Sequence, residues 1–259
     1  MTATVRIAQL YPDVLGITGD RGNVSALQTR LQRAGASVEF LPVNIGDDLP
    51  IDLDAIVLGN GPLSAMRGVR DDLLKHAERI RAHVADGGAL LAVGGGAELL
   101  SREVTTLEGE RIEGLGVFDA SVERTRQRKV GYIVVETPIG RVIGFEDYAS
   151  EWKLHDTEDG YGRVVSGQGS FALPTSGGQT ELPRGELIRI GNAIASNVQG
   201  PLLPLNPDLV RDILTGIATR RGLEWNLMAG VDSLDAYASG ARVAIETLVH
   251  GKGFNSIQL

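Results

Sequence analysis

Gly88-Ala-Leu-Leu-Ala-Val93 runs directly into Gly94-Gly95-Gly96, and a short helical segment through Leu99-Leu100 follows. The apolar run is typical of a strand that is buried on both faces, and the glycines allow a sharp turn from strand to helix. Asp54-Ala-Ile-Val-Leu58 has the same character and ends in Gly59-Asn60-Gly61-Pro62. Two such strands predict a parallel sheet, in which ligands bind where the strands end.

The segments around these two strands alternate between strand and helix patterns. Val5 to Leu10 is a short apolar run that predicts a first strand, and Ser37 to Val43 alternates like a second one. Between them, Leu27 and Leu31 lie on one face of a predicted helix, and residues 71–84 predict another. This order indicates an α/β fold with a mostly parallel, doubly wound sheet flanked by helices.

The middle of the chain has a different character. Residues 130–137 and 141–145 are strand-like, and the short turn 138–140 between them predicts an antiparallel hairpin. Residues 166–184 are rich in Gly, Ser, Pro and Thr and predict a long surface loop, after which residues 187–198 resume strand character. We therefore expect antiparallel strands added to the parallel sheet.

The C-terminal part is predicted to be helical. Asn206 suits an N-cap and Pro207 suits the first helical position of a helix that Gly222 ends. A last amphipathic helix is expected over about residues 234–249. We interpret residues 1–259 as a single domain with a C-terminal helical extension over about residues 223–259.

Composition excludes several classes of function. The chain has 259 residues and a formal net charge of −8, which argues against broad binding to the phosphates of nucleic acids. No apolar run approaches the length of a membrane span, and the first ten residues lack the plan of a signal peptide, so we expect a cytoplasmic protein. The chain contains no cysteine, and we expect neither a metal nor a cofactor.

Several motifs, in the same order and at similar spacing, carry a family resemblance. They are Leu10-Tyr-Pro-Asp-Val-Leu15, Gly19-Asp-Arg-Gly-Asn23, Gly114-Leu-Gly-Val-Phe-Asp119 and Gly200-Pro-Leu-Leu-Pro-Leu-Asn-Pro207, with a weaker match at Val142-Ile-Gly-Phe-Glu146. The chain resembles class I glutamine amidotransferases of the CobB/CobQ-like type, and among these the GatD-type glutaminase subunit of lipid II isoglutaminyl synthase. The resemblance implies a flavodoxin-like fold, release of ammonia from glutamine, and a Mur-ligase-like (MurT-type) partner subunit.

The chain departs from the family at both positions that the chemistry needs. The family forms a thioester on a cysteine at the elbow between strand and helix, and this chain has Gly94 there. The family's histidine precedes Gly-Pro-Leu-Leu-Pro, and this chain has Gln199, whose amide does not titrate near neutral pH. Ala97 and Glu98 replace an aromatic residue and a glutamine of the motif. The resemblance thus predicts an elbow without nucleophile or general base.

Other pocket residues are retained. Arg128 matches an arginine that the family uses to hold glutamine; the alternative is a solvated charge beside its basic neighbours. The corner glycines Gly59, Gly61 and Gly95 are candidates for backbone contacts to a ligand.

Three functions remain open from the sequence. The first is a non-catalytic amidotransferase-like subunit that acts as scaffold or regulator of a Mur-ligase-type partner in amidation of the cell-wall precursor lipid II. The second is a module that binds or senses glutamine or a similar small molecule. The third is an active glutaminase subunit, for example one that uses a partner's nucleophile.

Overall fold

The computed structural model describes residues 4–174 and 182–250, and within them one mixed sheet runs through the protein. Its parallel half has the order β12-β4-β3-β1-β2. These strands are β1 (Thr4–Leu10), β2 (Ser37–Val43), β3 (Ala55–Leu58), β4 (Ala89–Val93) and β12 (Ala193–Ser196). The predicted parallel sheet is confirmed, and both glycine-rich corners follow its strands.

The other half of the sheet is antiparallel and has the order β13-β8-β7-β9-β11, with β11 next to β12. Its strands are β7 (Ala120–Thr137), β8 (Gly140–Leu154), β9 (Gly160–Ser166), β11 (Arg184–Ile190) and β13 (Val198–Gln199), with β5 (Glu103–Thr105), β6 (Arg111–Glu113) and β10 (Phe171–Ala172) attached at the side. The predicted hairpin is confirmed, although its strands are longer than the sequence indicated.

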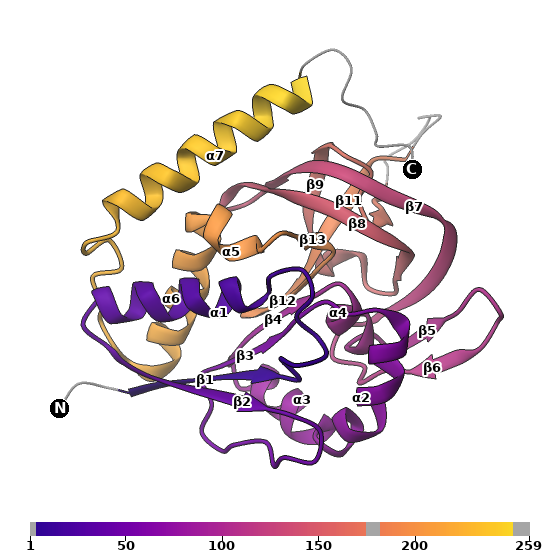
Figure 1. The fold of residues 1–259 in the computed structure, drawn as a ribbon, viewed down its shortest axis with the longest axis horizontal. Coiled ribbons are helices and arrows are strands. Elements are labelled where there is room, and N and C mark those ends of the chain that lie inside the picture. The colour runs from indigo at the N-terminus through magenta and orange to yellow at the C-terminus, as the bar shows by residue number, and fades with distance from the viewer. Residues whose placement is uncertain (1–3, 175–181, 251–259) are drawn as a thin grey trace.

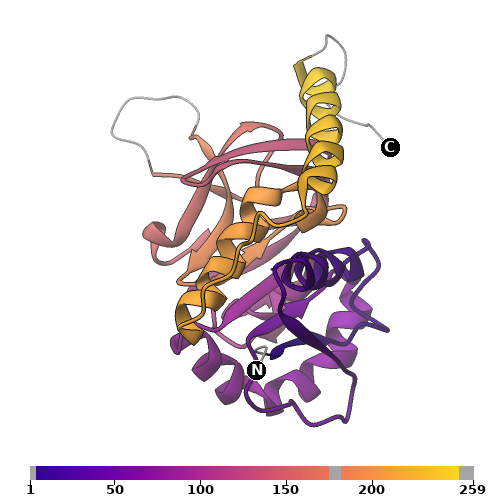
Figure 2. The ribbon, with the colours of Figure 1, turned by 90° about the vertical axis from the view of Figure 1, so that its left-hand side faces the viewer.

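Helices cover both faces of the parallel half (Figure 1). The helices α1 (Arg21–Arg33) and α6 (Pro207–Arg221) pack on one face, and α2 (Leu63–Lys75) and α3 (Ala77–Ala85) pack on the other. Short helices α4 (Gly95–Leu99) and α5 (Leu202–Leu205) follow β4 and β13, and α7 (Asp232–His250) lies outside α5 and β7 (Figure 2). None of the helices in the described residues is long and apolar enough to cross a membrane.

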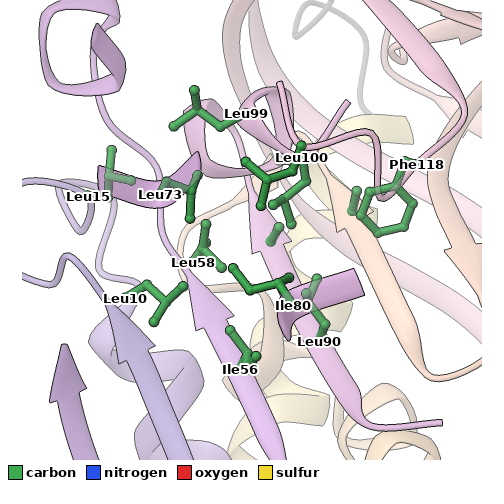
Figure 3. Packing of buried hydrophobic residues seen from close by; sticks show 14 of the residues in the cluster. Leu10, Leu15, Ile56, Leu58, Leu73, Ile80, Leu90, Leu99, Leu100 and Phe118 are labelled. Atoms are coloured by element: carbon green, nitrogen blue, oxygen red, sulfur yellow. The ribbon is translucent and has the colours of Figure 1, made fainter. Parts of the chain in front are cut away.

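The two faces of the sheet are buried in two separate cores because side chains alternate along each strand. Leu10, Ile56, Leu58 and Leu90 point to the core under α2 and α3 (Figure 3). Their neighbours along the strands join the core under α1 and α6; these are Val5, Ile7, Ala55, Val57, Ala89, Leu91 and Val93. The continuous apolar runs that decided the fold are therefore explained by burial on both sides.

Three sequence predictions need correction. The helix expected over residues 71–84 is two helices, because the His76 N–H donates to Leu73 O in a tightened turn that ends α2. The strand expected over residues 187–198 is interrupted by a turn at Gly191, which has a φ of +57°. The loop expected over residues 166–184 contains β10, in which Phe171 is buried, while residues 175–181 lie outside the described residues.

Asn206 occupies the N-cap position of α6 as predicted, but its side chain does not cap the helix. Its amide nitrogen donates to Ile143 O and Leu202 O, and its oxygen accepts the Ile143 N–H, all at 2.8 Å. The buried amide therefore ties β8 to α5, which positions the segment that follows Gln199.

His83 on α3 makes stability depend on pH. Its Nε2 lies 2.9 Å from Ala89 O, and burial lowers the pKa of the imidazole below its ordinary value of 6.5, although the carbonyl opposes this. The unfolded chain therefore takes up a proton at a higher pH than the folded chain. The free energy of unfolding consequently falls as the pH drops from the pKa of the unfolded imidazole toward the lower pKa of the folded one. In urea titrations, the free energy of unfolding of His83→Gln should decline less than that of the wild type between about pH 7.5 and about pH 5.5. Parallel curves for the two proteins would contradict this assignment.

Candidate functional site

Gly94 forms a sharp elbow between β4 and α4. Its backbone has φ +54° and ψ −123°, and its N–H donates to Ser196 O at 2.8 Å on the neighbouring strand β12. A nucleophile elbow holds its reactive residue on such a strained turn from strand to helix, so that the side chain projects from the end of the sheet. The backbone of an elbow is thus present, but its first helical residues carry no reactive side chain.

Asn60, in the corner after β3, fills the space where an elbow side chain would begin. A Cβ on Gly94 would lie 2.5 Å from Asn60 Cγ and closer still to Asn60 Oδ1, both within van der Waals overlap. Asn60 Oδ1 also accepts the Gly95 N–H at 2.9 Å. In elbow enzymes the N–H of the residue after the nucleophile stabilises the oxyanion. Here the protein's own amide oxygen takes that donor.

The glycines proposed as ligand-binding residues lie in a tight junction of loops. A Cβ on Gly95 would lie 2.5 Å from Gly61 O, and one on Gly59 would lie 2.7 Å from Asp20 Cβ. A Cβ on Gly61 would lie 2.5 Å from Leu15 Cδ2. Gly59, Gly61 and Gly95 leave no room for a side chain, because backbone or side-chain atoms of neighbouring loops approach each of them closely. Their contact with a ligand stays a prediction.

Asp20 supports the same junction from the side of α1. Its buried carboxylate accepts the Asn60 N–H at 3.0 Å and the Thr18 hydroxyl at 3.0 Å. Burial raises the pKa of Asp20, and these two hydrogen bonds oppose the rise. Asn23 Oδ1 accepts the Leu203 N–H at 2.8 Å. The Gly19-Asp-Arg-Gly-Asn23 motif thus holds the Asn60 backbone and the α5 segment in place.

Arg128 and Gln199 meet at one residue, Asp147. The Arg128 guanidinium pairs with the Asp147 carboxylate at 2.5 Å, and this pairing raises the pKa of Arg128. The buried Gln199 donates from Nε2 to Asp147 O at 3.2 Å. The structure therefore brings two of the predicted site residues together at Asp147, where the Arg128 side chain is 54% exposed; a role of Arg128 in holding glutamine stays a prediction.

Glu98 on α4 is buried inside the site in an ion pair. Its carboxylate lies 2.7 Å from Arg124 Nη2 and accepts the Ser150 hydroxyl at 2.9 Å. Burial raises the pKa of Glu98 in spite of these two partners. The guanidinium of Arg124, like that of Arg128, is engaged by a carboxylate of the protein itself.

These contacts limit the chemistry of the site. The chain has no thiol, and the amide of Gln199 does not titrate near neutral pH, so it cannot act as a base. In the part of the chain that the structure describes, no group of three or more His, Asp or Glu side chains is arranged to hold a metal. What remains at the elbow is a set of donors: the Gly94 and Gly95 N–H groups have acceptors from the chain, whereas the buried Arg124 Nε has no hydrogen-bond partner among the described residues.

Sequence reasoning missed Asn60, Asp147 and Glu98 as the residues that occupy the site. A signal existed for Asp147, because the family that the chain resembles continues the Val142-Ile-Gly-Phe-Glu146 motif with Asn-His, where this chain has Asp147 and Tyr148. For Asn60, the flanking glycines marked a corner but did not indicate which backbone group the amide contacts.

Comparison with known proteins shows the family to which the chain belongs. A model of the CobB/CobQ-like glutamine amidotransferase domain family matches residues 6–197. The GatD subunit of lipid II isoglutaminyl synthase (glutamine-hydrolyzing) from Streptococcus pneumoniae is 30% identical over 89% of this chain and 87% of its own length. The GatD subunit from Staphylococcus aureus is 26% identical over 84% of this chain and 86% of its own length.

Solved structures agree on the fold. A crystal structure of a glutamine amidotransferase, 21% identical, covers 82% of this chain and 98% of its own, with a TM-score of 0.51. The family match spans most of the chain, and the relatives match over nearly their whole length. The chain therefore belongs to the CobB/CobQ-like glutamine amidotransferase family, in its GatD-type branch.

Proposed function

We propose that this chain is a non-catalytic GatD-type subunit that acts as a scaffold or regulator of a Mur-ligase-type (MurT-type) partner in lipid II amidation. The observation that carries the proposal is the position of Asn60, whose amide oxygen accepts the Gly95 N–H and occupies the space of an elbow side chain. The proposal includes a cytoplasmic location.

The partner is part of the proposal because of the relatives. Both are named as subunits of a lipid II isoglutaminyl synthase, and the similarity extends over 87% and 86% of their lengths. A chain that is similar to such a subunit over most of its length, and that lacks cysteine, is suited to a role in which the fold and its surface matter.

The test distinguishes a subunit that supplies ammonia from glutamine from one that only assembles with the ligase. The Mur-ligase-type protein of the same organism is purified alone and in complex with this chain, and lipid II amidation is measured with glutamine or with an ammonium salt. We expect no glutamine-dependent glutamate release above that of the ligase alone, because no thiol is available to form the thioester. With ammonium we expect the complex to amidate faster or remain active longer than the ligase alone. Glutamate release that requires this chain would overturn the proposal in favour of the glutaminase alternative.

Glutamine titration by calorimetry tests the sensing alternative in the same preparations. The pairing of Arg128 with Asp147 leaves the guanidinium engaged, so we expect no binding heat at millimolar glutamine. Saturable heat that Arg128→Ala abolishes would instead support a glutamine-binding module.

A further inference from the structure

The C-terminal helix α7 turns its charged side chains toward the rest of the protein. Asp235 pairs with Arg30 of α1 and also lies 3.2 Å from Arg211 of α6. Arg242 Nη1 donates to Asn206 Oδ1 at 2.7 Å. These contacts fix the rotation of α7 about its axis, because they involve side chains on one face of the helix.

The same face continues toward the C-terminal end of α7. Glu246 pairs with Arg141 of β8 at 3.1 Å, and Arg242 Nη2 donates to Arg141 O at 2.8 Å. Among the α7 side chains that the structure describes, Asp232 in the first turn is the charged one that takes no part in these contacts.

Beyond the exposed Asp232 of the first turn, the described exposed side chains of α7 are uncharged and include both hydroxyl and apolar residues; the hydroxyl ones are Ser233, Ser239 and Thr247. Tyr237 is 80% exposed, Val243 is 59% exposed and Leu248 is 44% exposed. Small residues also lie on this outward face; these are Ala236, Gly240 and Ala244. A surface helix ordinarily has the opposite arrangement, with its apolar face toward the core and its charges toward water. A partly apolar outward face of this kind marks a surface that another protein covers.

A groove lies beside this surface, between α7 and the body of the protein. It has a volume of about 580 Å³ and runs between α7, α1 and the Gly200–Leu205 segment. The side chains of α7 that line it are Leu234, Tyr237, Ala238, Ala241 and Ile245. Arg30 is the charged side chain among the described lining residues, and it is engaged by Asp235. Gly200, which directly follows Gln199 in the sequence, lines one end of the groove, whereas Gln199 itself is buried and does not line it.

The charge and the size of this surface identify its occupant. A charged side chain in the groove would lose water without gaining a free counter-charge, so a fitting segment is apolar. A second copy fits poorly, because each chain carries a net charge of −8. Pairing of two α7 helices, each only about 28 Å long, would also bury much less than the roughly 800 Å² per partner of a standard stable interface.

We propose that the groove between α1, α5 and α7 binds an amphipathic helix of the Mur-ligase-type partner, with the apolar face of that helix in the groove and against Tyr237. This inference rests on the proposed function, because it assumes that such a partner exists. Binding of an amphipathic helix in an apolar groove is a common mode of recognition, and aromatic anchors dominate its affinity.

Two variants test the groove without disturbing the core. Ala241→Glu places an unpaired charge in the groove, at an exposed position where glutamate is also a good helix former. Tyr237→Ala removes an aromatic ring that is 80% exposed. Leu107→Glu is the matched control, because Leu107 is 50% exposed on the β5–β6 turn, away from α7.

Binding of each variant to the purified Mur-ligase-type subunit is measured by calorimetry, with circular dichroism to verify folding and light scattering to measure oligomeric state. We expect Ala241→Glu to bind roughly 30-fold more weakly or worse and Tyr237→Ala roughly tenfold more weakly, while Leu107→Glu stays within about twofold of wild type.

The possible failures are distinguishable. If the wild-type chain does not bind the subunit, the proposed function fails together with this inference. If the wild type binds and both groove variants bind as tightly as the control, the groove is not the interface and only this inference is overturned. The wild type could also be a dimer in the absence of the partner. If Ala241→Glu converts that dimer to a monomer, the groove binds a second copy of this chain and the inference is overturned.

Discussion

Replacing Gly94 by alanine is expected to lower the free energy of unfolding by about 3 kcal/mol. Two costs combine: the left-handed φ of +54° is unfavourable for a residue with a Cβ, and that Cβ overlaps the side-chain amide of Asn60. Gly68→Ala is the matched control. Gly68 lies in α2 without a positive φ, and a Cβ there meets open space. The control should stabilise the protein by up to about 1 kcal/mol because alanine is the better helix former.

A double-mutant cycle with Asn60→Gly separates the two costs. Asn60→Gly alone should cost about 1 kcal/mol for the hydrogen bond to Gly95. In that background Gly94→Ala should cost only the backbone part, so the two changes together should be less harmful than their sum. Additive costs in urea titrations would show that Asn60 does not occupy the space of the elbow side chain.

Introducing a cysteine at Gly94 and a histidine at Gln199 is expected to produce little activity by itself. In Gly94→Cys with Gln199→His, the new thiol meets the Asn60 amide, the Gly95 N–H stays bonded to Asn60, and Arg128 stays paired with Asp147. Glutamate release from glutamine should therefore remain near background. Adding Asn60→Gly and Asp147→Asn removes these three obstacles and should raise glutamate release by roughly a hundredfold or more over the two-residue variant.

Thiol labelling provides a second measurement that does not require turnover. Because the chain has no cysteine, the thiol introduced by Gly94→Cys is the single site for iodoacetamide, and mass spectrometry follows its alkylation. Alkylation should be several-fold faster when Asn60→Gly is also present. Equal labelling rates, together with equal activity of the two-residue and four-residue variants, would contradict an obstructing role for Asn60 and Asp147.

The parts of the fold that the sequence predicted are those with local causes. The buried strands β3 and β4 and their corners follow from apolar runs that end in glycine, since burial on both faces and the turn conformation each act on adjacent residues. The elbow at Gly94 belongs to this class. The break at His76 does not, because the apolar pattern of α2 continues into α3 and gives no sign of a turn.

The occupied site was beyond sequence reasoning for a different reason. The contact of Asn60 with Gly95 depends on how two corners from different strands approach and on one side-chain rotamer, neither of which leaves a periodic pattern. For α7 a pattern was present. Asp235, Arg242 and Glu246 share one helix face, but periodicity alone does not reveal which face of an amphipathic helix is inward.

The Asn60 and Asp147 contacts also bear on whether the stability of the folded elbow depends on the glutamine concentration. A protein that binds a ligand only when folded gains stability by mass action as the ligand concentration rises. Asn60 Oδ1 and the Asp147 carboxylate are joined to the chain by covalent bonds, so their local concentration is the same whatever the surrounding solution contains. The contribution of these two contacts to the stability of the elbow is therefore independent of the glutamine concentration.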